Sequence, residues 1–113
     1  MKVSKKFFAV LICFSISFSQ YAYCDFLGNI STKICNAIAD YKNSDISLNK
    51  LQDIMDASYI EASHAYREAD EENKTEIGYL IGSILGFRTV TKSFLIESAN
   101  LDYYISQFKE YSE

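Results

Sequence analysis

A chain of 113 residues, 49% of them apolar and 23% charged, fits one compact domain and leaves no room for a second. Its net charge is −4, from 15 acidic and 11 basic residues. Nucleic-acid binding rests on neutralising phosphates with Lys and Arg, so this balance argues against a nucleic-acid partner. It also argues against attraction to anionic membrane surfaces. The partner that such an acidic chain favours is a basic protein.

Residues 1–24 are predicted to be a secretory signal peptide. Three lysines precede an apolar run at 7–14, and small residues follow it. The run is shorter than the roughly 20 residues that a spanning helix needs, so we expect cleavage and no stable membrane span afterwards. Removal takes three lysines and no acid, which leaves 8 basic against 15 acidic residues and a net charge of −7. The mature domain, 25–113, is therefore expected to be periplasmic or secreted.

The cleavage site decides what the cysteines do. Cleavage after Cys24 is favoured and leaves Cys35 alone, which we interpret as a small buried apolar side chain. Cleavage after Ser19 would retain both cysteines and permit a Cys24–Cys35 disulfide in an oxidising compartment. Lipidation of Cys24 is a third alternative, disfavoured because the residue before it is the bulky Tyr23.

Apolar residues recur at intervals of three and four through the mature sequence, and no alternating run predicts a strand. The pattern predicts an all-α fold, a small bundle of three long helices followed by a short C-terminal helix. We expect the first helix at 25–41 and the second at 48–69, with Ser47 as its N-cap. The third is expected from near Thr75 toward a break at Asn100, which precedes the short helix.

Three glycines stand four residues apart inside an apolar run and are predicted to share one helical face. Each costs about 1 kcal/mol relative to alanine unless close packing offsets the loss, so we expect the third helix to be the buried centre of the bundle. The second helix carries a matching row of small residues, which predicts an antiparallel hairpin with the two rows in contact. The rows are Gly78, Gly82 and Gly86 on one helix and Ser58, Ala62, Ala65 and Ala69 on the other.

Two groups of residues are candidates for contact with a partner protein. An acidic corner between the second and third helices would dock a basic surface, or it is only a solvated turn. Seven tyrosines remain after residue 24, and tyrosine is favoured at interfaces because one end is apolar and the other forms hydrogen bonds. The candidates are Glu68, Asp70, Glu71, Glu72 and Glu76 at the corner and Tyr103, Tyr104 and Tyr111 near the C-terminus.

His64 is the one histidine of the chain. Glu61 precedes it at the Glu-x-x-His spacing of di-iron bundles, but those sites need two such pairs and further glutamates. An ion pair with Glu68, four residues on, is the favoured interpretation. Ser63 adjoins His64 at an angle of about 100° on a helix, so no nucleophile and base are brought together there. No metal, cofactor or catalytic group is predicted.

One resemblance bears on function. The predicted signal peptide, about ninety mature residues, Cys35 in the first helix and the sequence Gly-Tyr-Leu-Ile-Gly at 78–82 resemble the small helical periplasmic immunity proteins that protect bacteria from type VI secretion amidases. Those proteins commonly carry a cysteine just before the Gly-Tyr pair, whereas this chain has Thr75 and Glu76 there. The resemblance implies a protein that binds and blocks a cell-wall hydrolase, with a homodimer as one form, but without the stapling disulfide.

The sequence thus predicts an exported non-enzymatic protein that acts by protein–protein binding, with immunity against a cell-wall-targeting toxin as the leading hypothesis. A periplasmic regulator of phage lysis or of an envelope machine is the first alternative. The second alternative, from another class, is a small hydrolase or metal protein that uses His64.

Overall fold

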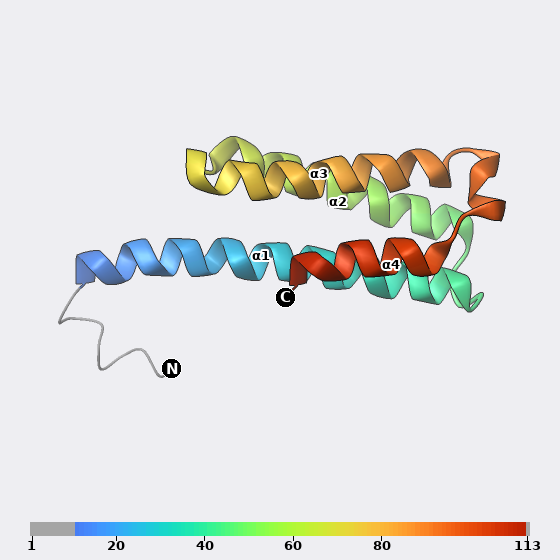
Figure 1. The fold of residues 1–113 in the computed structure, drawn as a ribbon, viewed down its shortest axis with the longest axis horizontal. Coiled ribbons are helices and arrows are strands. Elements are labelled where there is room, and N and C mark those ends of the chain that lie inside the picture. The colour runs from blue at the N-terminus through green and yellow to red at the C-terminus, as the bar shows by residue number, and fades with distance from the viewer. Residues whose placement is uncertain (1–10, 113) are drawn as a thin grey trace.

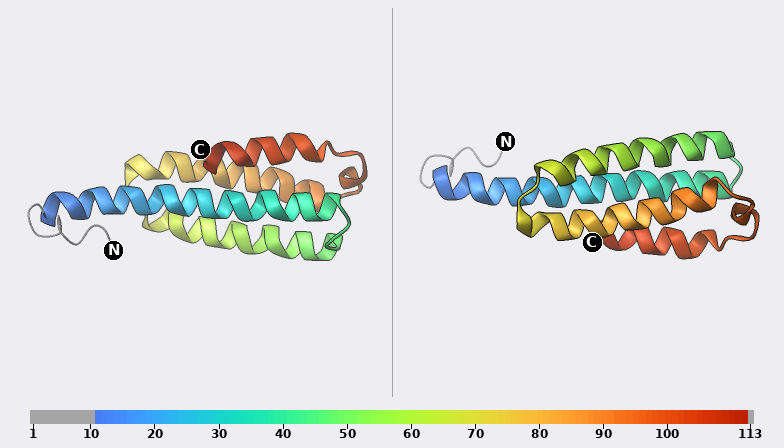
Figure 2. Two further views of the ribbon diagram at one scale, coloured as in Figure 1. Left: turned by 90° about the horizontal axis from the view of Figure 1, so that it is seen from below. Right: turned by 90° about the horizontal axis from the view of Figure 1, so that it is seen from above.

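The computed structural model describes the backbone of residues 11–112 and the side chains of residues 25–112. Throughout that part of the chain the regular structure is helical, with four α-helices that run up and down in alternation (Figures 1 and 2). The prediction of an all-α bundle with three long helices and a short last one is confirmed. Two short 3-10 helices complete the fold. The elements are α1 (Leu11–Lys42), α2 (Leu48–Glu68), α3 (Glu71–Thr91), η2 (Phe94–Ser98), α4 (Leu101–Lys109) and η3 (Glu110–Ser112).

The first helix is longer than the sequence pattern indicated. It begins at Leu11 rather than near Asp25, and its N-terminal part extends past the ends of the other helices (Figure 1). The predicted signal peptide falls partly on residues 1–10, outside the described residues, and partly on this extension. Beyond it, α1 contributes the fully buried Ile34 and Ile38 to the core.

A short turn that contains Ser44 and Ser47 connects α1 to α2. Ser44, in the turn after α1, has the left-handed conformation, with φ of 65°. Ser47 then caps α2, because its Oγ accepts a hydrogen bond from the Lys50 amide at 3.1 Å. The predicted N-cap is therefore confirmed. The two helices run antiparallel, and an ion pair between Lys33 and Glu61 at 3.3 Å joins their exposed sides.

The corner between α2 and α3 is tighter than expected. Only Ala69 and Asp70 separate the two helices. Asp70 caps α3, since its Oδ1 accepts hydrogen bonds from the Asn73 amide at 3.1 Å and from Asn73 Nδ2 at 2.8 Å. The expected start of the third helix near Thr75 is wrong for this reason. Glu71 and Glu72 lie in the first turn of α3, where the helix dipole stabilises acidic side chains.

Helices α2 and α3 form the expected antiparallel hairpin, but the glycines do not join them. A Cβ added at Gly82 or Gly86 would meet no atom within 4 Å, and one at Gly78 would only touch the Tyr66 ring at 3.6 Å. The predicted packing of these glycines against the small residues of α2 is therefore wrong. Of that second row, Ser58, Ala62 and Ala69 are buried and Ala65 is half-buried.

The physical reason lies in the register of α3. The buried face of α3 repeats at three and four and consists of Ile77, Leu80, Ile84, Phe87 and Thr91. On a helix of 3.6 residues per turn, Gly82 and Gly86 fall on the opposite side from that face. Tyr79, on the same open side, is 67% exposed. The third helix is thus not the buried centre of the bundle, because one of its faces stays open.

After α3 the chain passes through the short helix η2 and then reverses direction into α4. The helix stops at Thr91, whose carbonyl accepts a hydrogen bond from Gln52 Nε2 at 2.7 Å, so it does not continue to Ile96 as expected. Asn100 ends the following segment and caps α4 by accepting from the Tyr103 amide at 3.1 Å, which confirms the predicted break. Helix α4 then lies along α1 and α3 and inserts Phe108 into the core.

Candidate functional site

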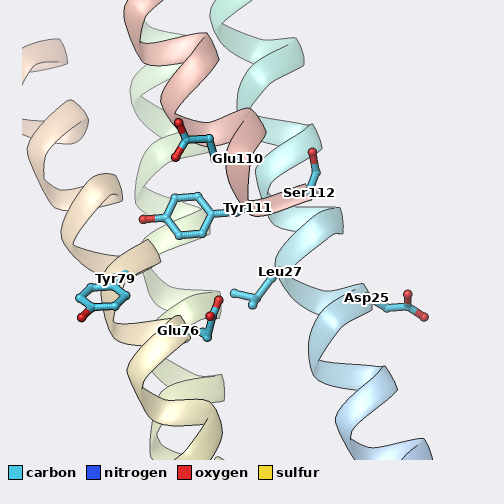
Figure 3. Close-up of a pocket in the computed structure, with 7 residues that line it drawn as sticks. All are labelled: Asp25, Leu27, Glu76, Tyr79, Glu110, Tyr111 and Ser112. Atoms are coloured by element: carbon cyan, nitrogen blue, oxygen red, sulfur yellow. The ribbon is translucent and has the colours of Figure 1, made fainter.

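One hollow in the described part of the molecule lies where α1, α3 and the C-terminal segment meet (Figure 3). Its volume is about 670 Å³, and it is open to solvent. Figure 3 shows the Tyr111 ring directed from η3 toward α3, with Glu76 and Tyr79 on α3. The hollow is lined by Asp25, Leu27, Glu76, Tyr79, Glu110, Tyr111 and Ser112. We call it the acidic hollow.

A second hollow, of about 350 Å³, lies further along α3 toward the start of α4. Gly82 and Gly86 leave its α3 side bare, and Tyr104 packs its ring on Phe87 with centroids 4.7 Å apart. Tyr103 stands beside Tyr104 and is 56% exposed. Its lining is Gly82, Ser83, Gly86, Phe87, Tyr103, Tyr104 and Gln107.

Both hollows are lined by α3 and by the C-terminal part of the chain, and the acidic hollow is also lined by α1. Residues 76 to 87 of α3 form one side and residues 103 to 112 of α4 and η3 form the other. Between the hollows the hydroxyl groups of Ser83 and Tyr111 are hydrogen-bonded at 3.0 Å. We call the two hollows together the α3/α4 furrow.

Charge is distributed unevenly along the α3/α4 furrow. Asp25, Glu76 and Glu110 are acidic residues in the lining of the acidic hollow, although the Asp25 carboxylate points away from it (Figure 3), whereas the second hollow is lined by uncharged residues. Among the described residues that line either hollow there is no Lys or Arg. The furrow therefore attracts cations at one end only.

Two cations at the C-terminal end of α3, Arg88 and Lys92, interact with α2 and not with the α3/α4 furrow. Arg88 Nε donates to Asp56 Oδ1 at 2.6 Å and lies over the Tyr59 ring, 5.3 Å from its centroid. Lys92 Nζ is 3.2 Å from the same Asp56 oxygen. The hydrogen bond from Arg88, with the second from Lys92, holds the pKa of the Asp56 carboxyl below its ordinary value of 3.8. This cluster fixes α3 to α2, on the far side of α3 from α4.

The predicted partner-binding residues are not brought together as one surface. Glu68, Asp70, Glu71 and Glu72 are exposed at the α2/α3 corner, and Glu72 lies one turn before Glu76 of the acidic hollow. Tyr103 and Tyr104 lie at the other end of the α3/α4 furrow, and Tyr104 is half-buried against Phe87. Tyr111 lines the acidic hollow itself.

The sequence reasoning missed five residues of the α3/α4 furrow that the structure brings together. Gly82 and Gly86 were assigned to internal packing, and Asp25, Tyr79 and Glu110 were not named as candidates, whereas Glu76 was assigned to the acidic corner. One signal in the sequence points to the three that lie on α3. The buried positions of α3 recur at 77, 80, 84 and 87, which leaves 79, 82 and 86 on the outside.

His64 does not meet Glu61 at a metal site. His64 is exposed, its Nε2 is 3.5 Å from Glu68 Oε2, and its Nδ1 is 3.5 Å from Arg67. The predicted pairing of His64 with Glu68 is confirmed. Glu61 instead pairs with Lys33 of α1. Within residues 25–112 no group of three or more His, Cys, Asp or Glu side chains converges to hold a metal ion.

Cys35 is half-buried, and its thiol donates a hydrogen bond to the Ile105 carbonyl of α4 at 3.4 Å. Burial raises the pKa of the thiol above its ordinary value of 9.0, and Lys109 lowers it in part. Cys24 belongs to the same continuous helix, where eleven residues separate the two Cα atoms by roughly 16 Å. A Cys24–Cys35 disulfide needs less than about 7 Å, so α1 excludes that bridge within one chain.

Comparison with protein-family models, with curated proteins and with solved structures finds no match to this chain. Among the described residues no helix has the length and apolar character that crossing a membrane requires. The fold and the furrow therefore define the class of protein, which is a small up-and-down helical bundle with an open groove on one side.

Proposed function

We propose that this chain is an exported helical protein that acts by binding another protein through the α3/α4 furrow, and that it inhibits a cell-wall-targeting toxin as an immunity protein. The partner presents a basic surface to the acidic hollow. The protein performs no chemistry in this role, and its effect is to cover the working surface of the toxin. Export follows from the lysines and the apolar run at the front of the chain.

One observation carries the proposal. The acidic hollow combines the carboxylates of Glu76 and Glu110 with two tyrosine rings and has no cation among its lining residues. Carboxylates without a neighbouring cation attract a basic surface, and tyrosine supplies apolar contact area with a polar end. Tyr79, with 67% of its surface exposed, gains the most contact area when a partner covers it. These properties are those of a protein-binding surface.

The residues that a hydrolase or metal protein would use are engaged in local contacts. Glu61 and His64 each pair with a different neighbour on the exposed side of α1 or α2. Cys35 lies against α4 with its thiol proton engaged and its pKa raised, which disfavours a nucleophilic thiolate. A binding role uses the open furrow, whereas the hydrolase or metal-protein alternative does not.

Protection of cells is the direct test. The experiment directs a cell-wall hydrolase encoded beside this gene to the periplasm, either alone or together with this protein. Cell lysis is then measured in both cases. We expect the wild-type protein to prevent lysis and the Glu76→Gln, Glu110→Gln double variant to protect at least tenfold less well. Glu97→Gln, an exposed substitution on η2 away from the acidic hollow, is the matched control.

Two results would contradict the proposal. If the wild-type protein left lysis unaffected, the proposed inhibitory role would be contradicted. Intact-mass measurement of the same cells is the second check, because a chain that still begins at Met1 in the cytoplasm would remove export. The expected mature chain begins at Asp25.

A further inference from the structure

We draw no further inference here: the strongest candidate, the exposed apolar patch that Phe94 and Leu95 form on η2 at one end of the bundle, rests on exposure alone, because nothing in the structure shows what covers it.

Discussion

The hydroxyl oxygens of Ser83 on α3 and Tyr111 on η3 lie 3.0 Å apart and connect the two walls of the α3/α4 furrow. This contact is partly buried and lies between the acidic hollow and the glycine-lined hollow. It ties the last residues of the chain to α3, and it holds the Tyr111 ring in the wall of the acidic hollow. The shape of the candidate site thus depends on a hydrogen bond between residues 28 positions apart.

Tyr111→Phe is expected to lower the free energy of unfolding by about 1 kcal/mol, the usual contribution of one partly buried hydrogen bond. Chemical denaturation monitored by circular dichroism measures it. Tyr103→Phe is the control, because Tyr103 is 56% exposed at the surface of α4. Equal unfolding curves for the two variants would show that the Ser83–Tyr111 contact does not hold the C-terminal segment.

Ser58→Ala is expected to stabilise the protein by about 1–2 kcal/mol. The Oγ atoms of Ser58 on α2 and Ser31 on α1 are buried and have no hydrogen-bond partner among the described residues. A buried hydroxyl without a partner retains its full desolvation cost, and alanine also has the higher helix propensity. Ser106→Ala, exposed on α4, gains helix propensity alone. A gain at Ser58 no larger than that at Ser106 would contradict the prediction.

Asp56→Asn is expected to lower stability at pH 7 by less than about 1 kcal/mol, since the ion pairs of Asp56 are partly exposed. The folded-state pKa of Asp56 is depressed by Arg88 and Lys92, so its contribution is full above 3.8 and is lost as the pH falls through that lower pKa. Urea unfolding at pH 7 and at successively lower pH would follow the difference between variant and wild type. A difference that persists unchanged under strongly acidic conditions would exclude this origin.

The sequence was sufficient to predict the helices and some of their ends. The three-and-four spacing of apolar residues identifies the four helices, and Ser47 and Asn100 are recognisable caps because their side chains suit that role. Asp70 was missed because it sits in a run of acids that also resembles a solvated turn. The length of α1 was missed because its front part was assigned to a signal peptide.

The position of the furrow was not predictable in the same way. A row of glycines indicates a bare helical face, but the sequence does not state whether another helix of the same chain covers it. That depends on which face of α3 meets α2, and Ile77, Ile84 and Phe87 determine that register by burying their larger side chains. Asp25, Glu76 and Glu110 lie on three elements, so only the bundle topology places them around one hollow.

Thermal unfolding of Gly82→Leu tests most directly whether the face of α3 that lines the α3/α4 furrow is open. A Cβ at Gly82 would meet no atom within 4 Å, and leucine is the better helix former by roughly 0.5–1 kcal/mol, so the melting temperature is expected to rise. Ala62→Leu, at a fully buried position of α2, is expected to lose about 1–3 kcal/mol by overpacking and shows that the assay detects close contact. A fall in the melting temperature of Gly82→Leu as large as that of Ala62→Leu would contradict the open furrow.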